Sequence, residues 1–352
     1  MTNKIIGIFG GGQLGKMICE EAHKLGFQTA IFCPEKDCVA SFVTNKTFVA
    51  NYDDFSALDK FIDFVDLVTL EFENIPTQAI EYVARKIPVF PEAKILKITQ
   101  NRLLEKSFLK ENKIAVTDFL EIQSLEDLQK GLEKFNFKAI LKTATLGYDG
   151  KGQFVLNKAS NLKEILQENE GKKLILEKFA NFEQEISVII TRNQNGEISC
   201  YDPLTNIHKN GILDESVYPA KISQEIKIKS QEIATQIANK LNLIGIIAVE
   251  FFVLKNGDLL VNELAPRPHN SGHFSMDGAI TSQFEQLVRA INNLPFGNNK
   301  FVFSGKMKNL IGEEINDIAK YLEDPNAKIY NYGKKFVKDG RKMGHVNFLN
   351  IF

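Results

Sequence analysis

The sequence contains no tryptophan, only four cysteines, and a formal net charge of −1 over 352 residues. The cysteines show no C-x-x-C spacing: Cys19, Cys33, Cys38 and Cys200. This pattern excludes a cysteine-rich zinc framework, and we expect reduced thiols in a cytoplasmic protein. The near-neutral charge provides no basis for binding nucleic acid or a membrane surface. No run approaches the ~20 apolar residues of a membrane span, and residues 5–9 are too few for a signal-peptide core.

What is present is the composition of an ordinary globular protein, with 44% hydrophobic and 25% charged residues. The chain is too long for one typical domain, so two or three domains are expected.

The most informative stretch is residues 247–274, which predicts a β-hairpin. Two runs rich in β-branched and aromatic residues flank Asn256 and Gly257, a dipeptide typical of hairpin loops. If these two residues form the loop, counting outward places Val253 opposite Leu260.

The same register places Glu250 opposite Glu263, with side-chain roots only about 5 Å apart. Two opposed carboxylates repel each other unless a hard divalent cation such as Mg²⁺, bound with nucleotide phosphates, lies between their oxygens. A solvated acidic pair is the alternative. Apolar residues expected on the same face favour the metal site: Phe252, Leu254, Leu259 and Val261.

A polar loop follows the hairpin and contains Arg267 between Pro266 and Pro268. Proline on both sides restricts the backbone, so the guanidinium is held in place. A fixed guanidinium suits a small planar anion bound at two points, and a surface salt bridge is the alternative.

Near the start of the chain, Gly10, Gly12 and Gly15 match the dinucleotide motif G-x-G-x-x-G after a predicted strand. Glu35 lies about where a ribose-binding acid belongs. The motif is weak alone, because any tight turn that brings the backbone close to a phosphate or sugar needs such glycines. No hydride-transfer residues accompany it, so an NAD-dependent dehydrogenase is disfavoured.

A further strand at residues 65–70 ends in two carboxylates, Glu71 and Glu73. Carboxylates at this end of a strand lie where open α/β sheets bind ligands. Capping of a helix by Asn74 ahead of Pro76 is a competing structural interpretation.

A second glycine-rich loop, at residues 145–152, follows a strand that carries Lys142. Amides freed by glycine can bind phosphate oxygens while Lys142 supplies charge, which predicts a flexible lid. No helix is expected after this loop, so it is not a P-loop. A plain hairpin turn is the alternative.

Together these motifs resemble the ATP-grasp superfamily. The segments LGYDGKGQ, NIHKNGIL, NELAPRPHNSGH and GRKMGHVNF are similar to the N5-carboxyaminoimidazole ribonucleotide synthetase family of purine biosynthesis, and so are GGGQLGKM and EFEN. One departure is Leu146, which stands where the family has a glycine before Gly147.

The resemblance implies an α/β and α+β fold in three domains: a Rossmann-like pre-ATP-grasp domain at 1–99, a small lid at 100–173, and a large domain at 174–352 with a C-terminal subdomain from about 300. It implies an ATP-dependent ligase that joins bicarbonate to 5-aminoimidazole ribonucleotide through carboxyphosphate. ATP and Mg²⁺, or Mn²⁺, would be required, and a homodimer is expected.

The resemblance also implies four sets of contacts. ATP would be bound by Arg102, Lys142, Gly147, Tyr148, Asp149, Gly150, Lys151, Gly152, Gln153, Glu177, Glu185, His208, Asn262 and Glu263. The metal would be bound by Glu250 and Glu263. Bicarbonate and carboxyphosphate would be held by the catalytic residues Arg267, His269 and Asn270. The ribonucleotide would be bound by Glu73, Tyr148, Asp149, Lys151, Lys334, Arg341 and Lys342.

Two alternative functions share these residues. One is another ATP-grasp enzyme of the purine pathway, such as the formate-dependent glycinamide ribonucleotide transformylase. The other is a nucleotide-binding regulatory protein without turnover, which the intact Glu250, Glu263 and Arg267 disfavour. A phosphate-release assay would separate an enzyme from a silent protein.

Overall fold

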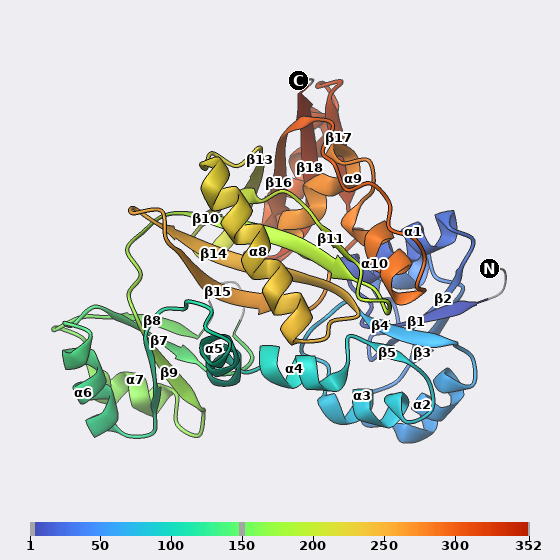
Figure 1. The fold of residues 1–352 in the computed structure, drawn as a ribbon. Coiled ribbons are helices and arrows are strands. Elements are labelled where there is room, and N and C mark those ends of the chain that lie inside the picture. Colours follow the sequence, from blue (N-terminus) through green and yellow to red (C-terminus); the bar gives the residue numbers. More distant parts are fainter. Residues whose placement is uncertain (1–3, 148–151, 351–352) are drawn as a thin grey trace.

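The computed structural model describes residues 4–147 and 152–350, and these residues form three β-sheets with helices packed on them (Figure 1). The expected lid residues Tyr148, Asp149, Gly150 and Lys151 lie outside the described residues. No helix within the described ranges combines the length and apolar character needed to cross a bilayer.

The N-terminal sheet is parallel, with strand order β3-β2-β1-β4-β5. Its strands are β1 (Ile5–Phe9), β2 (Gln28–Cys33), β3 (Lys46–Val49), β4 (Leu67–Leu70) and β5 (Val89–Phe90). Its helices are α1 (Gln13–Lys24), η1 (Val39–Phe42), α2 (Phe55–Ile62), α3 (Thr77–Ala84) and α4 (Ala93–Thr99). Alternate residues of β1 pack on opposite faces: Ile6 and Ile8 with α1, and Phe9 with α2. Both faces are therefore covered, as in other parallel sheets.

The second sheet is antiparallel, with order β6-β9-β7-β8. It comprises β6 (Phe119–Ile122), β7 (Ala139–Thr143), β8 (Gln153–Leu156) and β9 (Leu174–Lys178), covered by α6 (Leu125–Lys134) and α7 (Leu162–Glu168). The glycine-rich loop joins two strands, which confirms that it is not a P-loop. Strand β9 lies inside this sheet although the expected lid segment ended at residue 173, so the lid extends further along the chain.

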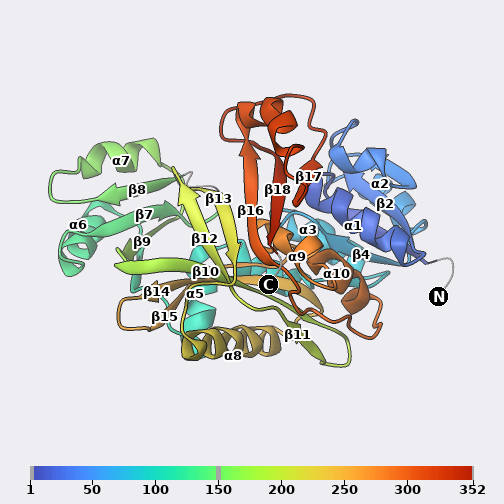
Figure 2. The ribbon, with the colours of Figure 1, turned by 90° about the horizontal axis from the view of Figure 1, so that it is seen from above.

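The largest sheet has the order β15-β14-β10-β12-β13-β16-β18-β17, with β11 on β10 (Figure 2). Its strands are β10 (Phe182–Arg192), β11 (Ile198–Cys200), β12 (Leu204–Lys209), β13 (Ile212–Tyr218), β14 (Gly245–Leu254), β15 (Leu259–Ala265), β16 (Ser304–Ile311), β17 (Ala327–Asn331) and β18 (Lys342–Asn350). The associated helices are α5 (Arg102–Glu111), α8 (Gln224–Lys240), η2 (Asn270–Phe274), α9 (Ser275–Gly278), α10 (Gln283–Ile291) and η3 (Gly312–Tyr321).

One apolar core joins the N-terminal sheet to the largest sheet. Ile18 of α1 and Ile31 of β2 belong to the same buried cluster as Phe284 and Leu287 of α10. Because this core is continuous, the C-terminal edge of the N-terminal sheet has a defined position against the loop that follows β15.

The hairpin β14–β15 exists, but its loop differs from the expected one. Leu254 N donates to Asp258 O at 2.8 Å, and Gly257 N donates to Leu254 O at 2.8 Å with Gly257 at φ +83°. The loop therefore has three residues, 255–257, and Val253 pairs with Leu259 instead of Leu260.

A β-bulge restores the predicted pairing further along the hairpin. The register shifts by one residue at Asn262, so Glu250 does lie opposite Glu263. Leu259 and Val261 were expected on the same face of the hairpin as the two glutamates, and this was wrong. Both side chains pack in the core on the opposite face. The bulge thus compensates for the longer loop before the chain reaches the paired carboxylates.

Candidate active site

Four neighbouring strands bring the acidic residues together. Glu263 lies on β15, Glu250 on β14, Glu185 on β10 and His208 on β12, which is the strand order in the sheet. Ligand atoms of Glu185, His208 and Glu250 all lie within 4.8 Å of one another. The polar face of this sheet edge therefore concentrates groups able to bind cations.

Glu250 is ionised and tied to the loop that follows the hairpin. His269 Nε2 lies 3.1 Å from Glu250 Oε1. Burial alone would raise the pKa of Glu250, but the bond to His269 and the nearby charges of His208 and Lys342 hold that pKa well below its usual range. Lys342 is far away in the sequence, so β18 contributes charge to this site.

Glu185 has the opposite electrostatic behaviour. Burial, assisted by repulsion from Glu250, raises the pKa of Glu185 to about 7. His208 Nδ1 lies 3.2 Å from Glu185 Oε2. The two carboxylates therefore divide into one firmly ionised group and one that takes up a proton near neutrality.

The second carboxylate of the hairpin pair is held by helix α5. Arg102 Nη1 donates to Glu263 Oε2 at 3.0 Å. Beside it, Asn262 Oδ1 is buried and accepts no hydrogen bond from any described residue. A buried amide oxygen without a donor next to an ionisable pair fits an additional cation or ligand.

Lys142 and Glu177 form the buried part of the expected ATP site. Lys142 Nζ on β7 donates to Glu177 Oε2 on β9 at 2.8 Å. Burial lowers the pKa of Lys142. Burial would also raise the pKa of Glu177, yet Lys106 and Lys142 together lower it. Both groups are therefore fixed in an ion pair beside Lys106 of α5.

Lys106 and Glu105 are site residues that the sequence patterns did not single out. Lys106 is fully buried, with Nζ 3.5 Å from Glu177 Oε1 and donating to Asn262 O at 3.3 Å. Glu105 accepts from Leu264 N at 3.0 Å, and burial raises its pKa to about 8. Their positions three and four residues after Arg102 could have identified them, because residues at this spacing share one face of a helix.

Arg267 is paired inside the molecule. Its guanidinium binds both carboxylate oxygens of Glu73, with Nη2 donating to Oε1 at 2.8 Å and Nε donating to Oε2. The two side chains are only 17% and 19% exposed. Arg267 does form a salt bridge, but not on the surface as the alternative supposed. The pair is largely buried between the N-terminal sheet and the loop after β15.

The N-terminal glycine motif holds a carboxylate of the protein itself. Gly12 N and Gly15 N donate to the two oxygens of Glu71 at 2.9 and 3.3 Å. These amides, at the start of α1, are the ones that a dinucleotide pyrophosphate would need. Glu35 is exposed. Two amides that a pyrophosphate would need are therefore already occupied by Glu71, which argues against a dinucleotide at this loop. Asn74 does not cap α3, whose N-cap is Pro76.

The described part of the lid loop has two left-handed residues. Gly152 has φ +71°, and a Cβ there would lie 2.8 Å from Thr143 Oγ1. Leu146 has φ +61° and is 71% exposed. A leucine is strained in this left-handed conformation, whereas the glycine that the family resemblance implies here would adopt it freely.

Lys334 and Arg341 lie in the connection between β17 and β18, and Asn270 begins η2. Lys334 Nζ donates to Lys342 O at 2.6 Å, and Arg341 Nη1 donates to Phe336 O at 3.1 Å. Asn270 exchanges side-chain amide hydrogen bonds with Asn309 at 2.9 and 2.6 Å. Lys334 and Arg341 are thus each held by a backbone carbonyl of residues 336–342, and their roles toward a ligand stay predictions.

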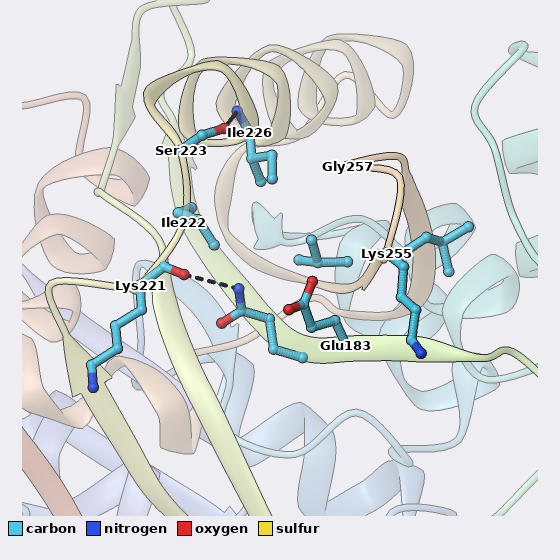
Figure 3. Close-up of a pocket in the computed structure, with 10 residues that line it drawn as sticks. Glu183, Lys221, Ile222, Ser223, Ile226, Lys255 and Gly257 are labelled. Carbon is cyan, nitrogen blue, oxygen red and sulfur yellow. Dashed lines mark hydrogen bonds between the residues drawn. The ribbon is translucent and has the colours of Figure 1, made fainter.

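A separate pocket of about 400 Å³ lies at the hairpin tip and the start of α8 (Figure 3). Glu183, Lys221 and Lys255 line it, and Gln184 Nε2 donates to Lys221 O at 3.0 Å. None of the expected site residues is among its lining residues, so this pocket is distinct from the acidic sheet edge.

Comparisons with known proteins identify the family of the chain. Residues 3–100 match a ribonucleotide synthetase preATP-grasp domain, residues 107–284 an ATP-grasp domain, and residues 306–350 a phosphoribosylaminoimidazole carboxylase C-terminal domain. The N5-carboxyaminoimidazole ribonucleotide synthase of Bacillus subtilis is 40% identical over 98% of this chain and 91% of its own. The chain belongs to the N5-carboxyaminoimidazole ribonucleotide synthase family. It is therefore an ATP-grasp ligase of purine biosynthesis.

Two further relatives extend this family assignment. The bifunctional purine synthesis protein purC/E of Dictyostelium discoideum is 44% identical over 97% of this chain, which spans only 36% of that longer protein. A structure from Aspergillus clavatus in complex with ADP and 5-aminoimidazole ribonucleotide has a TM-score of 0.93 and 28% identity, covering 99% of this chain and 94% of that one. The expected ATP-grasp fold is confirmed.

The residues present fit the ATP and metal that the family implies. The facing Glu250 and Glu263 and the unpartnered oxygen of Asn262 are hard oxygen donors of the kind Mg²⁺ prefers. Lys142, on the adjacent lid sheet, would supply positive charge for phosphates. The contacts of individual residues with either ligand stay predictions.

Proposed function

We propose that this protein uses ATP to carboxylate 5-aminoimidazole ribonucleotide with bicarbonate, giving N5-carboxyaminoimidazole ribonucleotide, ADP and phosphate. Family membership supports the reaction. The structural observation that carries the proposal is the bond between His269 and Glu250. It joins the loop that contains Arg267 to the carboxylate pair expected to hold the metal.

The chemistry requires activation of a poor electrophile. A bicarbonate oxygen attacks the γ-phosphorus of ATP, ADP leaves, and carboxyphosphate forms. Carboxyphosphate then breaks its C–O bond to phosphate and delivers CO₂ to the exocyclic amine of the ribonucleotide, which loses a proton. Such phosphoryl transfer depends on positioning and charge stabilisation, and it needs no side-chain nucleophile.

The ATP site that we propose uses residues of the lid sheet and of the largest sheet. Lys142 and Arg102 would stabilise the phosphates, while Glu177 orients Lys142 through their 2.8 Å bond. Glu185, His208 and Asn262 complete the nucleotide contacts, together with Gly147, Gly152 and Gln153. Mg²⁺ held by Glu250 and Glu263 would neutralise charge on the phosphate oxygens during transfer.

The small acid would lie near the loop after β15. Arg267 provides a planar pair of donors, and Glu73 fixes its orientation through two hydrogen bonds. His269 and Asn270 follow directly in the sequence. Each has one side held within the protein, by Glu250 and Asn309 respectively. We therefore assign these three residues to bicarbonate and carboxyphosphate.

The ribonucleotide would contact Glu73 and the basic cluster of Lys334, Arg341 and Lys342. The charge of Lys342 already influences Glu250. A stable phosphate monoester suits such a cluster. The division into domains at 1–99, 100–173 and 174–352, adjusted so that β9 belongs to the lid and α5 to the large domain, is part of this proposal. So are the homodimer and the cytoplasmic location.

The decisive experiment is ADP release measured with each substrate omitted in turn. We expect the full rate only when ATP, Mg²⁺, bicarbonate and the ribonucleotide are all present. Formate should not replace bicarbonate. An equal rate without bicarbonate, or a higher rate with formate and glycinamide ribonucleotide, would contradict the proposal.

A further inference from the structure

The glycine-rich loop at residues 10–15 binds Glu71 through two backbone amides. Gly12 N donates to Oε1 at 2.9 Å and Gly15 N to Oε2 at 3.3 Å. Gly12 is the N-cap of the 12-residue helix α1 and forms no side-chain cap bond. The carboxylate of Glu71 therefore takes the position that anions favour at a helix N-terminus.

The three glycines of the motif are all adapted to this side chain. A Cβ at Gly10 would lie 2.5 Å from Glu71 Cγ, one at Gly12 would lie 2.9 Å from Oε1, and one at Gly15 would lie 3.3 Å from Cγ. Gly10 also has φ +99°, a backbone conformation that favours glycine. The G-x-G-x-x-G spacing is thus explained by an internal carboxylate.

Glu71 begins the short segment that reaches Arg267. Strand β4 ends at Leu70, and Glu73 is two residues beyond Glu71. At the far end of the segment, Gln100 Nε2 donates to Glu73 O at 2.7 Å and to Ile75 O at 2.8 Å. The segment is therefore anchored on both sides of the Glu73 side chain.

Electrostatics link the same groups. Burial raises the pKa of Glu71, while the amides of Gly12 and Gly15 and the charge of Arg267 act in the opposite direction. Because Glu73 and Arg267 are bonded at two points, a small displacement of residue 73 must move the guanidinium or break a bond. Anchoring of Glu71 thus bears directly on where Arg267 points.

We propose that Glu71 is a positioning residue for Arg267: held by the Gly12 and Gly15 amides, it fixes the segment that presents Glu73 to the Arg267 guanidinium. The inference rests on the proposed role of Arg267 at the bicarbonate site. The loop at residues 10–15 would then support the carboxylation reaction by holding Glu71, without itself contacting a phosphate.

The test begins with Glu71→Gln. Its amide has one acceptor oxygen for two backbone donors, so one contact is lost while the volume is kept. We expect kcat to fall by about tenfold to a hundredfold through misplacement of Arg267, with the KM for ATP within about twofold of wild type. Gly12→Ala is the reciprocal variant: its backbone angles suit alanine, but the new Cβ displaces the carboxylate and should produce the same kinetic change.

Asp66→Asn is the matched control. Asp66 Oδ2 accepts from Ile5 N at 2.7 Å, which is also a carboxylate–amide bond, but it lies at the opposite end of β4. We expect its kcat to stay at the wild-type value. Acetate, which matches the atoms removed in Glu71→Ala, should partly restore the kcat of that variant and leave Asp66→Asn unchanged.

A double variant decides whether Glu71 acts through Arg267. If it does, adding Glu71→Gln to Arg267→Met should cause no further loss of kcat. The inference would be overturned if the kcat losses of the two single variants multiplied in the double variant. It would also be overturned if kcat were unchanged in both Glu71→Gln and Gly12→Ala. Wild-type protein that releases ADP without bicarbonate would instead refute the proposed function, so the two failures are distinguishable.

Discussion

Arg267→Met tests whether the buried ion pair with Glu73 serves catalysis as well as stability. Methionine keeps much of the volume of the arginine stem but removes the guanidinium. Glu73 then remains with its side chain only 19% exposed and both oxygens without the two arginine donors. The variant should therefore fold less stably and lose kcat, for two separable reasons.

The magnitude follows from the burial of the pair. Removing one partner of a buried ion pair costs about 3–5 kcal/mol, because an uncompensated charge remains. Both side chains keep some solvent contact, so we expect the lower end, about 3 kcal/mol. Replacing both partners is often nearly neutral. Glu73→Gln combined with Arg267→Met should therefore recover most of the stability and none of the kcat.

The pH dependence has a definite sign. In the wild type, burial opposes ionisation of Glu73, but Arg267 brings its pKa below the usual value. This carboxylate therefore stabilises the fold above its unfolded pKa, and that contribution is lost as the pH falls through the folded pKa. In Arg267→Met burial is opposed only by a backbone hydrogen bond at Glu73 and by His269, so the folded pKa of Glu73 rises, and the stability deficit should shrink as the pH falls from about 7 towards 5.

The assays are urea unfolding at several pH values and steady-state ADP release. The reasoning would be refuted if the double variant were no more stable than Arg267→Met, because Glu73 would then not be the group left unpaired. A normal kcat in Arg267→Met would refute the assignment of Arg267 to the reacting anion.

Three further predictions concern the metal pair, the lid and the basic cluster. Glu250→Gln and Glu263→Gln should each abolish Mg²⁺-dependent turnover while the protein still folds, and near-normal turnover at saturating Mg²⁺ would contradict the site. Gly152→Val should weaken ATP binding in a direct binding assay, because a β-branched side chain resists positive φ and meets Thr143; unchanged affinity would mean that the loop is only a turn. Arg341→Ala should raise the ribonucleotide KM about tenfold, from a lost charge-assisted contact of about 1.5–3 kcal/mol. A raised bicarbonate KM instead would reverse our division of the anion sites.

The hairpin shows how far local sequence patterns reach. The Asn256–Gly257 signal and the period of two predicted both strands and the facing carboxylates. The loop length and the bulge at Asn262 were not predictable, because they depend on Val253 and Val261 packing into the core beneath the sheet. Two register errors cancelled, so Glu250 and Glu263 were still paired correctly.

The sequence alone determined the ATP-grasp fold and the types of residue at each strand end. Hydrophobic periodicity, glycine turns and sequence motifs are all features of short segments, so they can be recognised without the tertiary structure. Which charged group meets which was decided only by tertiary structure. Arg267 lies 194 residues from Glu73, and Gly12 lies 59 residues from Glu71. The first contact exists because one apolar core docks the N-terminal sheet against α10, and the second because β1 and β4 are neighbouring strands of that sheet. A pairing created by docking or by strand order leaves no pattern within either segment, so a glycine loop that suits a dinucleotide holds a glutamate instead.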